Sequence, residues 1–63
     1  MKNKFKYELN QIIMSDFGLV KITYRHHGRN INFYEVILEE GDYAGETWTF
    51  DEEELDDRQL WTY

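Results

Sequence analysis

The stretch INFYEVIL, residues 31–38, has the strongest strand pattern in this chain. Its β-branched and aromatic residues pack well on a pleated surface. Successive side chains of a strand point to opposite faces. One face carries Asn32, Tyr34, Val36 and Leu38. Both faces are mostly apolar, which predicts a central strand covered on two sides.

Two weaker strand patterns precede this stretch. Residues 11–14 (QIIM) form a short apolar run, and residues 19–25 (LVKITYR) are rich in strand-forming residues. Alternation places Val20, Ile22 and Tyr24 together on one face of the second pattern. We therefore expect two strands here, joined by a short turn.

Strand patterns also occur nearer the two ends of the chain. Residues 1–7 alternate lysine with other residues, which is typical of a short edge strand and equally of a frayed terminus. Residues 46–50 (ETWTF) alternate as well, with Trp48 and Phe50 opposite two threonines. Residues 59–63 (QLWTY) are too apolar to lie wholly in water, which indicates a last strand or a docked tail.

The segment between the last two strand patterns favours a helix. Asp51 and Glu54 have the spacing of a capping box, and three acids in the first turn interact favourably with the helix dipole. The sequence predicts one turn of 3₁₀- or α-helix, with Leu55 pointing inward.

Length and composition fix the broad class of the protein. A chain of 63 residues forms one domain, residues 1–63, with a small core. The absence of Cys excludes disulfides and thiolate metal sites. Aromatic residues make up 17% of the chain, so stability must come largely from aromatic packing, from self-association, or from both.

This order of elements resembles the SH3-like small barrel found in many short bacterial and phage proteins. The resemblance covers residues 7–57 and rests on residues 7–13 (YELNQII), 17–22 (FGLVKI), 34–38 (YEVIL) and 47–55 (TWTFDEEEL). It implies an all-β fold, a small SH3-like barrel of four to five antiparallel strands with one helical (3₁₀) turn near the C-terminus. It also implies a binding module, because such barrels present loops and one groove to a ligand.

Catalytic chemistry finds little support in these residues. The chain has no Cys nucleophile, and its single serine, Ser15, has no His beside it in sequence. General acid–base catalysis needs a carboxyl group in a pocket, and a chain this short has little room for one. We expect no enzymatic activity, no catalytic residues and no cofactor.

Metal binding is not expected either. His26 and His27 are adjacent, so on a strand their side chains point to opposite faces, and an exposed hairpin tip explains them better. The acidic runs at residues 39–42 and 51–54 lack the alternating ligand spacing of a Ca²⁺ loop.

Charge is distributed unevenly along the chain. Residues 1–34 carry six basic residues and two acids, whereas residues 35–63 carry eleven acids and one base, giving a net charge of −6. A block of one sign creates a field that selects partners by charge, although an acidic surface also serves simply to keep a small protein in solution.

The acidic half predicts a surface that attracts a basic protein. Acids along one face can imitate the phosphates of DNA and so occupy the basic cleft of a DNA-handling host protein, which would make the chain a DNA mimic or inhibitor of phage or mobile-element origin. Tyr43 and Trp61 would supply apolar anchors. The predicted partner-binding surface comprises Glu39, Glu40, Asp42, Tyr43, Glu46, Asp51, Glu52, Glu53, Glu54, Asp56, Asp57 and Trp61.

Two alternatives belong to other functional classes. A nucleic-acid-associated barrel would use the basic half, through Lys21, Tyr24, Arg25 and Arg29, although an isoelectric point near 4.7 argues against direct nucleic-acid binding. A structural accessory protein would associate with itself, as a homodimer. No apolar run reaches the length of a membrane span and no signal peptide is evident, so we expect a cytoplasmic protein with no membrane partner.

Overall fold

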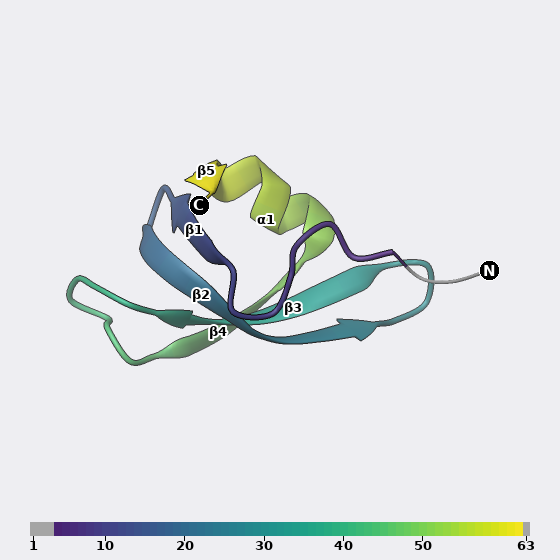
Figure 1. Cartoon of the computed structure of the whole chain (residues 1–63), viewed down its shortest axis with the longest axis horizontal. Helices are drawn as coiled ribbons and strands as arrows, with labels where there is room; N and C mark the ends of the chain where they lie inside the picture. The colour runs from purple at the N-terminus through teal and green to yellow at the C-terminus, as the bar shows by residue number, and fades with distance from the viewer. Residues whose placement is uncertain (1–3, 63) are drawn as a thin grey trace.

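A computed structural model describes residues 4–62, which form one five-stranded antiparallel sheet and a short helix (Figure 1). The elements along the chain are β1 (Ile12–Ser15), β2 (Gly18–His27), β3 (Asn32–Leu38), β4 (Thr47–Asp51), α1 (Glu52–Arg58) and β5 (Gln59–Thr62). The strand order is β4-β3-β2-β1-β5, which leaves β4 and β5 as the two edges of an open sheet. The prediction of a small, antiparallel, β-dominated fold with one helical segment is confirmed.

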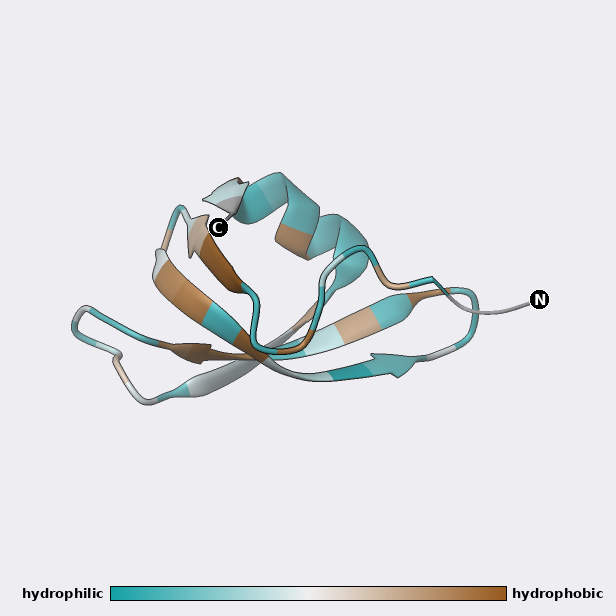
Figure 2. Cartoon of the chain, viewed as in Figure 1, coloured by the Kyte–Doolittle hydropathy of each residue, from teal (hydrophilic) through white to brown (hydrophobic). Residues whose placement is uncertain are grey.

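The core lies between the twisted sheet and the segments that cross it. Figure 1 shows α1 and the segment before β1 on the same side of β2 and β3. The buried hydrophobic side chains are Tyr7, Ile13, Val20, Ile22, Tyr34, Val36, Leu38, Phe50 and Leu55. In Figure 2, α1 is hydrophilic except for one hydrophobic position, and Leu55 is its buried residue.

The central strand β3 lies between β2 and β4, as its apolar pattern predicted. The face that carries Asn32, Tyr34, Val36 and Leu38 is buried, whereas the other face, which the sequence also predicted to be covered, is half-buried. Strand β4 also follows its pattern, because Phe50 is buried and Trp48 half-buried while Thr47 and Thr49 are exposed.

A bulge in β2 shows that one predicted face was wrong, because Tyr24 does not share a face with Ile22. The pairing register of β2 with β3 shifts between Ile22 and Tyr24, so the alternation changes sides at that point. Tyr24 consequently points outward with 56% of its surface exposed, instead of sharing the buried face of Ile22. The shift turns Arg25 inward, where its guanidinium lies 4.7 Å from the centroid of the Phe5 ring.

The helix begins as its sequence predicted and is longer than one turn. Asp51 is the N-cap, and its Oδ1 accepts a 2.7 Å hydrogen bond from the backbone N–H of Glu54. The helix runs seven residues, and its last residue, Arg58, lies 3.6 Å from the Glu54 carboxylate. Leu55 is fully buried, as predicted.

Residues 4–7 do not form the predicted edge strand. Residues 1–3 lie outside the described part of the chain, and residues 4–7, here called the N-terminal arm, have no strand conformation. The arm crosses the core near β3 and α1, and its backbone N–H groups bond to side chains rather than to a neighbouring strand.

Candidate partner-binding surface

The acidic hairpin loop, residues 39–46, connects β3 to β4 at one end of the molecule (Figure 1). Backbone hydrogen bonds close its base, from Leu38 N–H to the Glu46 carbonyl at 2.9 Å and from Gly45 N–H to the Leu38 carbonyl at 2.8 Å. Every residue of the loop is exposed. Its four carboxylates therefore stand on a hydrogen-bonded turn and face solvent; they belong to Glu39, Glu40, Asp42 and Glu46.

Tyr43 is the aromatic residue of this loop. Its ring is 56% exposed and lies 6.2 Å from the ring of Trp48 on β4. Trp48 in turn donates a 3.1 Å hydrogen bond from Nε1 to Glu46 and packs 5.0 Å from Phe17. Tyr43 thus adjoins an aromatic group that continues through Trp48 and Phe17 to the buried Phe50.

The charge of the loop is not neutralised within the described structure. Among residues 4–62, ion pairs join Lys6 to Asp56 and Arg58 to both Asp16 and Glu54, and none reaches the acidic hairpin loop. No basic residue occurs in the sequence between Glu35 and Asp57. The loop therefore carries four acids without an ion pair among the described residues, and one exposed aromatic side chain, Tyr43.

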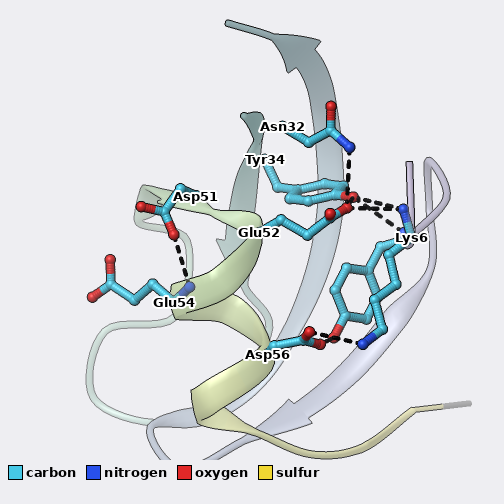
Figure 3. A network of polar contacts seen from close by, with 8 residues as sticks. Lys6, Asn32, Tyr34, Asp51, Glu52, Glu54 and Asp56 are labelled. Atoms are coloured by element: carbon cyan, nitrogen blue, oxygen red, sulfur yellow. Dashed lines mark hydrogen bonds and ion pairs between the residues drawn. The ribbon is translucent and has the colours of Figure 1, made fainter. Parts of the chain in front are cut away.

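The acids of α1 have different roles from those of the loop. Asp51 caps the helix and Glu54 pairs with Arg58, so both are engaged within the helix. Glu53 and Asp57 are exposed. Glu52 and Asp56 lie four residues apart, on the same side of the helix, and face the N-terminal arm (Figure 3).

Glu52 is the centre of a polar network (Figure 3). Its carboxylate accepts hydrogen bonds from the Tyr34 hydroxyl, from the Lys6 backbone N–H at 2.9 Å and from Asn32 Nδ2 at 3.2 Å. Burial opposes ionisation of Glu52, but these three donors outweigh it and lower the pKa of its carboxyl group. Burial and the hydrogen bond to Glu52 raise the pKa of Tyr34 to about 12.

Asp56 closes the same network at its other end. It accepts hydrogen bonds from Lys6 Nζ at 2.7 Å and from the Tyr7 hydroxyl, and these two donors lower the pKa of its carboxyl group. Burial and the hydrogen bond to Asp56 raise the pKa of Tyr7 well above its usual value. Both inward carboxylates therefore hold the arm on the body of the protein.

The phenols of this network predict a loss of stability in alkali. The folded chain keeps the Tyr34 proton up to about pH 12, whereas the unfolded chain releases it near pH 10.0. The unfolded state is therefore favoured progressively as the pH rises between these values, so we expect the free energy of unfolding to fall across that interval.

Urea denaturation followed by circular dichroism at several alkaline pH values measures this fall. Tyr34→Phe should reduce it, because that variant lacks the phenol whose pKa is raised in the folded chain. A wild-type free energy of unfolding that stays constant up to about pH 12 would contradict the prediction.

The residues of the nucleic-acid alternative are not gathered into one basic strip. Arg25 packs on Phe5 and donates a 3.1 Å hydrogen bond to the Tyr7 carbonyl, so it supports the arm. Lys21 is half-buried on β2, and Arg29 is exposed in the turn between β2 and β3. Tyr24 does join an aromatic group on the outer face of the sheet.

This outer aromatic group consists of Tyr24, His26 and Phe33. The ring of His26 stacks on Phe33 at 5.0 Å, and the ring of Tyr24 lies 5.7 Å from His26. Tyr34, on the same strand as Phe33, is fully buried and offers no exposed ring.

Trp61 lies apart from the acidic hairpin loop. It is 45% exposed and belongs to β5, where it pairs with Met14 of β1. The sheet order places β5 at the edge opposite β4, so the two predicted anchors, Tyr43 and Trp61, are near different edges.

An open pocket of about 640 Å³ lies between the β2–β3 turn and α1. It is lined by Lys4, His27, Asn30, Ile31, Asn32, Glu52, Glu53 and Asp56. Within residues 4–62, no three His, Asp or Glu side chains come together in a way that would hold a metal ion.

No protein-family model matches the chain, and neither a curated protein nor a solved structure matches it. In the part of the chain that the structure describes, no helix has both the length and the apolar character needed to cross a membrane. The functional argument therefore depends on the geometry of this chain.

Sequence reasoning missed the network residues Tyr7, Asn32 and Tyr34. A signal was available, because Asn32 and Tyr34 place polar groups on the inward face of β3, and buried polar groups need partners. The partners are Glu52 and the N-terminal arm, which are distant in sequence.

Proposed function

We propose that this chain is a small, non-enzymatic binding module whose acidic hairpin loop engages a basic surface of a partner protein. The observation that carries the proposal is the arrangement of that loop. Its four carboxylates are exposed, form no ion pair among residues 4–62, and lie in the same loop as the exposed side chain of Tyr43. Such a surface is complementary to lysine and arginine side chains.

The loop carboxylates and Tyr43 would contribute differently to the complex. Exposed carboxylates steer a basic partner toward the loop and speed association, while adding little affinity each. A rigid aromatic side chain at the centre of an interface supplies much of the binding energy. The packing of Tyr43 on Trp48 supports this role, because a side chain that is already ordered loses less entropy on binding.

A narrower form of the proposal gives the chain an SH3-like fold and a DNA-handling partner. The strand order β4-β3-β2-β1-β5, with α1 between β4 and β5, supports an SH3-like arrangement of the kind found in short phage and bacterial proteins. The exposed acids Glu53 and Asp57 add a second acidic group on α1. In this narrower form, the acidic side chains imitate the phosphates of DNA. The chain would then block a basic, DNA-handling protein of a bacterial host.

Reversal of the loop charge tests the proposal. The variant Glu39→Lys, Glu40→Lys, Asp42→Lys should lose capture of a basic protein from a bacterial lysate, because the complementary field is inverted. Wild-type capture should weaken in about 0.5 M salt, which screens exposed charges beyond a few Å. Affinity purification followed by mass spectrometry measures both effects.

The matched control reverses charge on the helix instead. Glu53→Lys, Asp57→Lys reverses two exposed acids whose side chains form no hydrogen bond or ion pair among residues 4–62. It should retain the partner if the loop alone is the site, and loss of the partner in this variant too would extend the surface to α1. Equal capture by the wild type and the loop variant would reject the loop as the binding surface.

A further inference from the structure

Strand β4 has backbone groups that no neighbouring strand of the described chain uses. It forms one edge of the sheet and pairs with β3 on its other side. At the start of this ladder, the Leu38 N–H donates a 2.9 Å hydrogen bond to the Glu46 carbonyl. Along an antiparallel strand, successive residues point their backbone groups alternately toward the neighbour and away from it. The backbone groups of Trp48 therefore face β3, whereas the N–H and C=O groups of Thr47 and Thr49 point along the free edge.

The free edge of β4 lacks the features that keep an edge strand from pairing. Natural edge strands are protected by lysine or proline, by a bulge, or by a covering segment. The sequence of β4 is TWTFD, and its register with β3 runs without a shift. Thr47 and Thr49 are exposed, so no segment among residues 4–62 covers them. The opposite edge strand, β5, has an irregular register with β1, so β4 is the edge more open to a further strand.

The surroundings of this edge are acidic. The acidic hairpin loop leads directly into β4, and at the other end of the strand Asp51 caps α1, whose first turn is acidic as well (Figure 1). Antiparallel pairing of two β4 strands would bring the loop of one copy beside the start of the helix of another, and like charges repel. A segment that carries lysine or arginine would instead meet opposite charge at both ends. Charge complementarity therefore favours a basic segment over a second copy of the chain.

We propose that β4 binds an extended, basic segment of the partner protein by strand addition. The inference rests on the proposed function, which supplies a basic partner, and it adds how that partner is held. The backbone of the segment would pair with the free N–H and C=O groups of Thr47 and Thr49, while its basic side chains would meet the acidic hairpin loop. A residue of the segment opposite the half-buried Trp48 would lie beside that ring, so an apolar side chain fits there.

Two synthetic peptides test the strand addition on the full chain. The first is a capped peptide that alternates lysine with valine. The second has the same sequence with every backbone N–H replaced by N-methyl, so it keeps the charge and side chains but cannot donate to a strand. Nuclear magnetic resonance of the isotope-labelled protein should show that the first peptide slows solvent exchange of the Thr47 and Thr49 amide protons. We expect the methylated peptide to bind at least about tenfold more weakly, since two hydrogen bonds are lost.

The variant Thr49→Pro tests the same edge from the side of the protein. Proline removes the N–H that points along the free edge and leaves the ladder with β3 in place. It should weaken binding of the unmethylated peptide about tenfold. Thr49→Val is the matched control, because it keeps the N–H, and it should bind as the wild type does. If Thr49→Pro fails to fold, the comparison of the two peptides decides, since it needs no variant.

The outcomes separate this inference from the proposed function. Equal binding of the two peptides, or no binding of either, would overturn strand addition, whereas the proposed function is decided by the charge reversal in the acidic hairpin loop. Exchange of the Thr47 and Thr49 amide protons that slows with protein concentration, without peptide, would mean that a second copy covers the edge. That result would also overturn the proposal.

Discussion

Leu55→Ala should lower the free energy of unfolding by about 2–5 kcal/mol, the usual cost of truncating a buried leucine. Leu55 is fully buried and is the only buried side chain of α1. A helix of seven residues is not stable on its own, so it depends on this contact. Total stabilities of small domains are of the same order as this loss, and we therefore expect much of the variant to be unfolded at room temperature.

Urea denaturation monitored by circular dichroism measures this effect. Leu60→Ala serves as the control, because it is the same substitution at a leucine with 63% of its surface exposed. We expect it to change the free energy of unfolding by no more than about 0.5 kcal/mol. Similar denaturation midpoints for Leu55→Ala and the wild type would show that α1 does not stabilise the core.

Glu52→Ala should be the second most disruptive substitution, with an expected loss of about 2–3 kcal/mol. Its carboxylate accepts hydrogen bonds from Tyr34, Asn32 and the Lys6 backbone, and its removal leaves these donors without that acceptor. The arm would lose its link to α1 at the same time.

Glu53→Ala is the matched control for Glu52→Ala. Glu53 is the next residue, carries the same charge and is exposed, so its truncation should change stability by no more than about 0.5 kcal/mol. Thermal melting of both variants compares the hydrogen-bonded Glu52 with the exposed Glu53. Equal melting temperatures would contradict the assignment of Glu52 to the network.

This contrast matters for tests of binding. A charge reversal that includes Glu52 would damage the fold and could be mistaken for loss of a binding surface. The acidic hairpin loop is free of that ambiguity, because of its four carboxylates only that of Glu46 accepts a hydrogen bond within residues 4–62, from Trp48. Substitutions at Glu39, Glu40 and Asp42 therefore report on recognition rather than on folding.

Local patterns in the chain were sufficient for β1 to β4 and for the start of the helix, although not for residues 4–7, which form no strand. The alternation in residues 31–38 predicted which side chains share a face of β3, because side-chain direction in a strand follows from position, but only the fold decided which face is buried. The cap at Asp51 was predictable for a similar reason, since the bond to Glu54 joins residues three apart. These features depend on near neighbours, which the sequence displays directly.

The roles of individual charges depended on tertiary structure. In the sequence, residues 51–57 are an acidic run with one interruption, and nothing distinguishes Glu52 and Asp56 from Glu53 and Asp57. The fold distinguishes them, because it brings the N-terminal arm from 46 to 50 positions away against one side of α1. The bulge after Ile22 likewise turned Arg25 toward Phe5. Such contacts join segments that are distant in sequence, so patterns of neighbouring residues do not predict them.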